Sequence, residues 1–113
     1  MTRIAVMTLE ARRTGSQCRS LFIAVSTPEI DPKDSHDDTY RTLIELEHFY
    51  KPLYIYGADS LQSLGLAISM IQARLQTIVD DGWTLFYPGT EDIADPRLML
   101  DLERGSRTEP TAE

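Results

Sequence analysis

An apolar stripe in the second half of the chain constrains the fold more than any other feature. Its residues recur at spacings of three, four, three, four and three, the period of one face of an α-helix: Leu61, Leu64, Ile68, Ile71, Leu75 and Ile78. Gly82, after Asp80 and Asp81, suits the residue that ends such a helix. The pattern predicts one long amphipathic helix over residues 60–81, which must bury its stripe against another element.

Runs rich in β-branched and aromatic residues predict the strands that the helix would cover. They span 3–11, 20–26, 40–47, 53–57 and, after the helix, 83–89. We therefore expect an α+β fold, with a mostly antiparallel sheet of about five strands and the long helix packed on one face.

The run at 97–103 fits two structures. Leu98, Leu100 and Leu102 alternate as in a strand, whereas Asp95-Pro96 is a good helix start. We favour a strand at this position.

Length and composition indicate one domain. A chain of 113 residues with 42% hydrophobic and 26% charged residues can bury a core of its own. We expect a single domain over residues 1–103, an acidic loop at 27–39 without regular structure, and a disordered tail at 104–113.

Charge and the absence of targeting patterns narrow the class of protein. Asp and Glu number 18 against 11 Lys and Arg, a net charge of −7 that disfavours binding to nucleic acid. No apolar run has the length of a membrane span, and the N-terminal residues lack the order of a signal peptide. Cys18 is the single cysteine, which fits a reducing compartment. A cytoplasmic protein that binds neither nucleic acid nor membrane is expected.

The second face of the predicted sheet is the candidate interaction surface. Phe22, Tyr54 and Tyr56 alternate onto this face, and no second long helix is predicted to cover it. An apolar face without an internal cover indicates a partner protein or a second copy of the chain. We therefore expect a non-enzymatic protein-interaction module, with a homodimer as one form of it.

Other polar clusters do not predict chemistry. The loop from Asp31 to Asp38 is rich in oxygen ligands and includes His36, but it lacks the glycine and closing glutamate of a calcium loop, so a solvated loop is favoured. His36 and His48 lie in different segments and form no zinc motif. Cys18 has no neighbouring nucleophile signature, and Glu45 and Glu47 alternate as solvated carboxylates do. No catalytic residue, metal or cofactor is predicted.

The segment 57–64, GADSLQSL, carries two resemblances. Its first five residues resemble the serine motif of acyl carrier proteins, which implies a phosphopantetheine arm on Ser60. The strands on both sides of the helix, and Gln62 where that motif commonly has an acid, favour a helix start instead. In that interpretation Asp59 is the N-cap and Gln62 closes a capping box. A carrier protein or enzyme with a site around Asp59 and Ser60 is the alternative function.

The second resemblance covers residues 40–90, where the chain is similar to a widespread family of small uncharacterised bacterial proteins. It is carried by the pattern G-x-D-S-x-Q-[AS]-L, matched by Gly57, Asp59, Ser60, Gln62, Ser63 and Leu64. This resemblance implies a stand-alone small domain with a protein-interaction role.

Overall fold

The computed structural model describes residues 2–34 and 38–99. In chain order the elements are β1 (Arg3–Arg12), β2 (Arg19–Ser26), β3 (Glu29–Ile30), β4 (Tyr40–Glu47), β5 (Leu53–Gly57), α1 (Ser60–Asp80), β6 (Thr84–Phe86) and α2 (Pro96–Met99). The predicted tail at 104–113 lies outside the described residues, as do residues 35–37 of the predicted loop.

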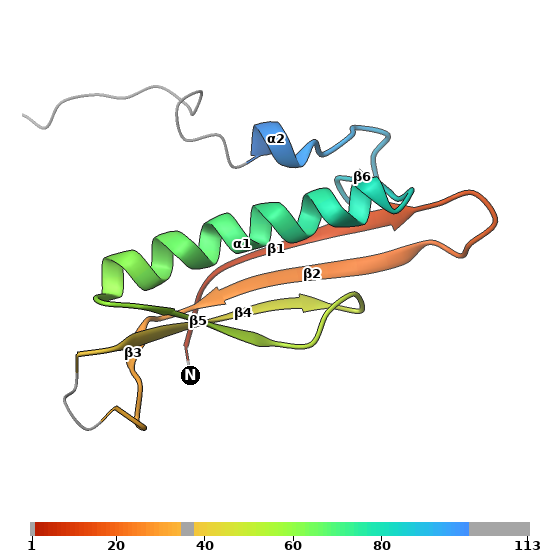
Figure 1. Ribbon diagram of the computed structural model, residues 1–113. Helices are drawn as coiled ribbons and strands as arrows, with labels where there is room; N and C mark the ends of the chain where they lie inside the picture. The colour runs from red at the N-terminus through yellow and green to blue at the C-terminus, as the bar shows by residue number, and fades with distance from the viewer. Residues whose placement is uncertain (1, 35–37, 100–113) are drawn as a thin grey trace, which may run out of the picture.

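The strands form one antiparallel sheet, so the predicted α+β class is confirmed (Figure 1). Its order is β3-β4-β2-β1-β6, and β5 also pairs with β4. The β1–β2 hairpin is its longest pairing, running from Arg3 opposite Ser26 to Ala11 opposite Arg19. The sheet has six strands instead of about five, because Glu29 and Ile30 pair with Arg41 and Tyr40 inside the segment predicted to lack regular structure.

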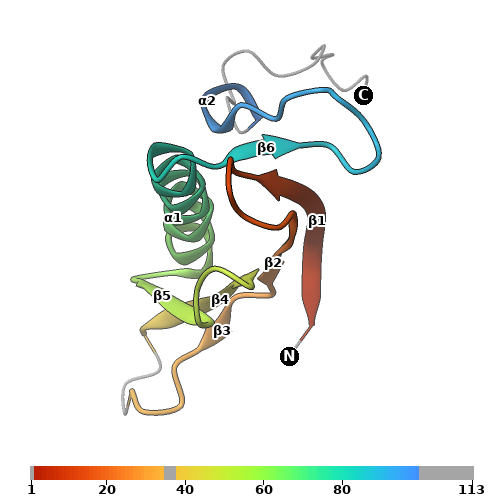
Figure 2. The same cartoon turned by 90° about the vertical axis from the view of Figure 1, so that its right-hand side faces the viewer.

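Both helices lie on one side of the sheet (Figure 2). The core is formed between α1 and the sheet, where the side chains that become fully buried include Leu9, Leu21, Ile44, Leu46, Leu75 and Ile78. Trp83 extends this core at the end of α1 and meets the ring of Phe49 edge-on, with ring centres 5.3 Å apart. α2 packs on α1, and Gln72 donates a hydrogen bond from its side chain to the carbonyl of Pro96 at 3.0 Å.

The strand prediction for residues 97–103 is wrong where the structure describes it, because Pro96–Met99 is a helix. The carboxylate of Asp95 accepts a hydrogen bond from the backbone N–H of Arg97 at 2.9 Å, and its carbonyl accepts from Leu98 and Met99. A capping aspartate followed by proline therefore overrides the alternation of leucines. Residues 100–103 lie outside the described part.

The long helix is confirmed, but its buried face differs from the predicted stripe. The buried residues are Ser63, Ala67, Ile71, Leu75 and Ile78, whereas Leu61 is 80% exposed. The helix approaches β5 so closely at its start that only small side chains fit beneath it. In the second half of the helix, the large apolar residues of the sequence are therefore the buried ones. In the first turn they are not, because the buried position is held by the small residue Ser63 and Leu61 is exposed.

Candidate functional site

Strand β4 shows which side of the sheet is covered. Thr42, Ile44 and Leu46 are buried beneath α1. Because side chains alternate along a strand, Leu43 and Glu45 point to the opposite side. We call this opposite side the open face, since both described helices lie on the other side of the sheet (Figure 2).

The three residues predicted to form an interaction surface all lie on the open face. Their cross-strand partners place them there: Phe22 lies opposite Glu47, Tyr54 opposite Leu43 and Tyr56 opposite Arg41. Tyr56 is 49% exposed, and Phe22 and Tyr54 are half-buried. The alternation in the sequence therefore located these side chains correctly, although their role stays a prediction.

Two arginines cover the half-buried rings, which sequence reasoning missed. The guanidinium of Arg3 lies 4.9 Å from the ring centre of Phe22 and donates to both carboxylate oxygens of Glu45, at 2.8 and 3.1 Å. The guanidinium of Arg41 lies 3.9 Å from the ring centre of Tyr54 and donates to Glu29 at 2.7 Å. Each ring is therefore held in a cation–π contact whose cation is itself anchored by a carboxylate.

These ion pairs also fix the charge of the open face. Hydrogen bonds from Arg3 lower the pKa of the Glu45 carboxyl, and the same bonds raise the pKa of Arg3. The hydrogen bond to Glu29 raises the pKa of Arg41 in the same way. Glu45 is therefore not poised to exchange a proton near neutral pH, as a general base would be.

The helix start is capped by Asp59 as predicted, whereas the Gln62 side chain reaches back to Ala58, one residue before the N-cap that a capping box would use. The Asp59 carboxylate accepts from the backbone N–H of Gln62 at 2.7 Å, and the Gln62 side-chain oxygen accepts from the N–H of Ala58 at 2.6 Å. Ser60 begins the helix, is exposed, and takes part in neither hydrogen bond. Asp59 and Gln62 thus have a structural task that accounts for their presence beside Ser60.

A buried polar contact behind this helix start was not foreseen. Ser63 is fully buried, and its hydroxyl lies 2.7 Å from that of Thr42 on β4. Gly57 makes the approach feasible, because a Cβ at that position would lie 2.5 Å from the backbone nitrogen of Ser63. In the sequence, this contact is indicated only weakly, by a glycine and a serine six residues apart across a strand-to-helix junction.

The acidic loop has an internal hydrogen-bond network over its described part. Asp31 accepts from the backbone N–H of Lys33 at 3.1 Å with its carboxylate, and from Asp34 at 3.0 Å with its carbonyl. His36 and Asp37 lie outside the described residues. Within residues 2–34 and 38–99, no three His, Cys, Asp or Glu side chains come together as metal ligands would.

Cys18 is exposed, and its thiol donates to the carboxylate of Glu10 at 2.8 Å. That hydrogen bond to a negative group raises the pKa of the thiol and lowers the pKa of Glu10. Since the thiolate is the nucleophilic form, Glu10 suppresses the reactivity of Cys18. His48 is far along the chain at the end of β4, in a left-handed backbone conformation with φ of 78°.

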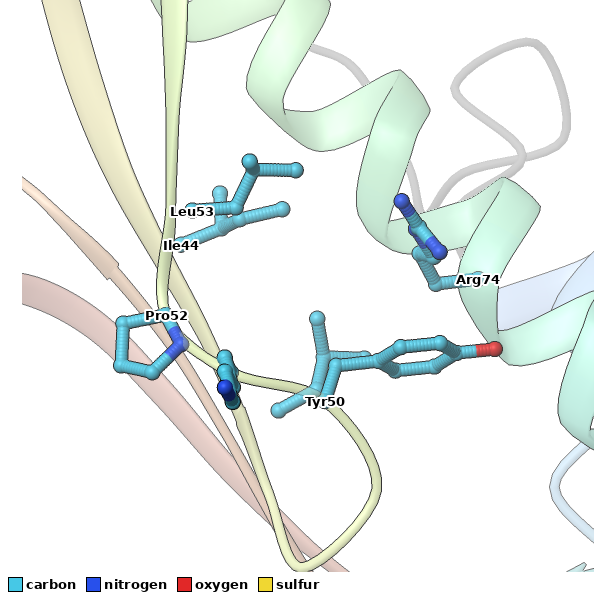
Figure 3. Close-up of a pocket in the computed structure, with 7 residues that line it drawn as sticks. Ile44, Tyr50, Pro52, Leu53 and Arg74 are labelled. Atoms are coloured by element: carbon cyan, nitrogen blue, oxygen red, sulfur yellow. The ribbon is translucent and has the colours of Figure 1, made fainter.

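A pocket of about 220 Å³ opens between the β4–β5 connection and α1 (Figure 3). Ile44 and Leu53 supply apolar walls, and Tyr50 and Arg74 lie at one side, with the guanidinium 4.7 Å from the ring centre. Its lining has cations and an aromatic ring but no carboxylate.

Comparisons with protein-family models, with curated proteins and with solved structures found no match. The family resemblance of the segment 57–64 accordingly stays a prediction. No helix among the described residues is long and apolar enough to cross a membrane.

Proposed function

We propose that this protein is a non-enzymatic protein-interaction module that acts through its open face. The observation that carries the proposal is the pairing of each half-buried ring with an anchored arginine: Phe22 with Arg3, and Tyr54 with Arg41. Aromatic residues and arginine are the types most enriched where binding energy concentrates in protein interfaces.

Pre-ordering of these side chains supports the same proposal. Binding immobilises exposed side chains, which costs free energy, and long arginine side chains have the most freedom to lose. The ion pairs with Glu45 and Glu29 already restrict Arg3 and Arg41 before a partner arrives. The exposed ring of Tyr56 then supplies apolar area that a partner can cover.

The partner is another protein, with a second copy of the chain as the homodimeric form of the same proposal. A net charge of −7 disfavours nucleic acid and anionic membrane surfaces. The free thiol of Cys18 fits the reducing cytoplasm. The open face carries both signs of charge, so it suits a partner surface that is itself mixed in charge.

The test is a Tyr56→Asp variant, with Leu61→Asp as the matched control. Both side chains are exposed, but Leu61 lies on the helix at 80% exposure and away from the open face. Wild type and Leu61→Asp should retain one stoichiometric partner protein in pull-downs from the native host, and Tyr56→Asp should lose it. A partner protein that survives Tyr56→Asp, or no partner protein bound by the wild type, contradicts the proposal.

The alternative function is a carrier protein or an enzyme with its site at Asp59 and Ser60. The observation in its favour is that Ser60 is exposed at the first residue of α1, where a transferase could reach it. Intact-mass spectrometry after coexpression with a phosphopantetheinyl transferase tests it. An added mass that disappears in Ser60→Ala would establish the carrier form, and an unchanged mass would remove it.

A further inference from the structure

Strand β1 has one edge that is only partly paired. Along one side it pairs with β2 from Arg3 to Ala11, but along the other it pairs with β6 over Glu10–Arg12 alone. Within the part of the chain that the structure describes, Arg3–Leu9 therefore has no strand on its second side. Backbone N–H and C=O groups along such an edge are free to pair with another strand.

This edge lacks the features that normally prevent pairing. Ile4 is 51% exposed and Val6 is 61% exposed. The segment Arg3–Leu9 has no proline, no lysine and no acidic residue, and its one charge, Arg3, is engaged by Glu45. The pairing irregularity with β2 lies at the start, between Arg3 and Ala5, so the strand is regular from Ala5 onward. An exposed apolar edge of this kind is ready to pair with another strand.

An apolar groove runs beside the same edge. Its volume is about 250 Å³, and every residue that lines it is apolar. Ala5 and Met7 of β1 form one wall, Ile68 and Ile71 of α1 form the other, and Met99 of α2 contributes as well. A strand added beside β1 would place every second side chain over this groove, because side chains alternate along a strand.

We propose that a second copy of this chain covers the edge, by antiparallel pairing of β1 with its own twofold-related partner. The pairing is self-complementary: around a twofold axis perpendicular to the sheet, Ala5 and Met7 of each copy lie beside the groove of the other. The apolar side chains that alternate along β1 of one copy therefore match the apolar groove of the other copy.

The distribution of charge also favours a second copy of the chain as the partner of the β1 edge. Each chain has a net charge of −7, so most approaches between two copies set carboxylates against carboxylates. No Asp or Glu occurs before Glu10, so the β1 edge is a part of the sheet where two copies can meet without that repulsion. The dimer would join two sheets edge to edge, with both α1 helices on one side and the two open faces continuous on the other. The inference goes beyond the proposed function and leaves Tyr54 and Tyr56 uncovered, because β4 and β2 separate their strand β5 from the β1 edge.

Sedimentation equilibrium on three forms of the full chain tests the proposal. Wild type should be a dimer that dissociates on dilution, and Val6→Lys should be a monomer, because it sets two like charges at the centre of the pairing. Leu61→Lys, which changes a still more exposed apolar residue on the helix, should remain a dimer. The melting temperature of each variant at low concentration reports whether its monomer is folded, so loss of the dimer is separated from loss of the fold.

Cross-linking supplies a second readout of the same contact. In a Cys18→Ser background, Val6→Cys should form a covalent dimer with a short bis-maleimide, whereas Leu61→Cys should not.

A wild-type monomer at all concentrations, or a dimer that survives Val6→Lys, overturns the proposal. So does a dimer lost in Tyr56→Asp, because Tyr56 lies on β5, away from the β1 edge, and that result assigns self-association to the open face. A monomer whose β1 amides exchange faster after truncation at Met99 overturns it in favour of the chain's own C-terminal residues as the cover.

Discussion

The hydroxyl oxygens of Thr42 and Ser63 lie 2.7 Å apart, and both side chains are fully buried between β4 and α1. This contact joins the strand that carries the open face to the helix that covers the core. Gly57, which has Ser63 against its backbone, completes the junction. A polar pair enclosed in this way stabilises one arrangement of strand and helix, because neither hydroxyl has water as a replacement partner.

Removal of one member of this pair should destabilise the fold more than removal of both. Thr42→Val keeps the shape of the side chain but leaves the Ser63 hydroxyl with only the Ser60 carbonyl at 3.4 Å, and should cost about 1–3 kcal/mol. Thr42→Val/Ser63→Ala should be more stable than Thr42→Val alone. Urea unfolding of the wild type, both single variants and the double variant measures the coupling. Additive single effects would contradict it.

Substitution of two glycines should have opposite effects. At Gly57 a methyl group would meet backbone atoms of Ser63, which cannot rotate away, so Gly57→Ala should destabilise the fold by about 1–3 kcal/mol. At Gly65 nothing lies within 4 Å of the added Cβ, so Gly65→Ala in mid-helix should stabilise by about 0.5–1 kcal/mol. Thermal and urea unfolding give both values. Equal effects would show that helix propensity, and not the close approach, governs this junction.

The Asp59 cap should matter to stability and the neighbouring serine should not. Asp59→Ala removes the acceptor for the Gln62 N–H and should cost about 0.5–2 kcal/mol. Ser60→Ala should change the free energy of unfolding little, because its hydroxyl takes no part in the cap. Chemical denaturation measures both. If Ser60→Ala abolished function while stability stayed unchanged, the carrier alternative would replace the interaction module.

Acid should weaken the fold partly through the Arg3–Glu45 ion pair. Hydrogen bonds from Arg3 lower the pKa of Glu45 from its ordinary value of 4.5. The folded-state pKa is thus below the unfolded one, so this stabilisation is complete above the unfolded pKa and is lost as pH falls through the folded pKa. Glu45→Gln should therefore lose less stability than wild type between about pH 7 and about pH 3. Arg3→Gln, which removes the donor of these hydrogen bonds, should reduce the loss in the same way. Parallel pH profiles for wild type and Glu45→Gln would contradict this.

Local sequence patterns predicted most helices and strands of the fold, but not how every element packs against its neighbours. The strands at β1, β2, β4 and β5, the long helix and its Asp59 cap follow from periodicity and capping chemistry, which act over a few residues. The short α2 was mispredicted because alternating leucines compete with a capping Asp95, and four residues are too few for periodicity to decide. The exposure of Leu61 was missed because it depends on how closely α1 approaches β5.

Some features of the open face also follow from the sequence, and others depend on the tertiary structure. The amino-acid sequence by itself determined that Phe22, Tyr54 and Tyr56 would share one face, because side chains alternate along every strand. Only the tertiary structure decided that Arg3 lies over Phe22 and binds Glu45, which is 42 residues away in the chain. Only the strand order leaves Arg3–Leu9 without a strand on one side among the described residues. Alternation and capping arise between near neighbours in sequence, whereas ring stacking, ion pairing and a free edge depend on which distant strands the fold sets side by side.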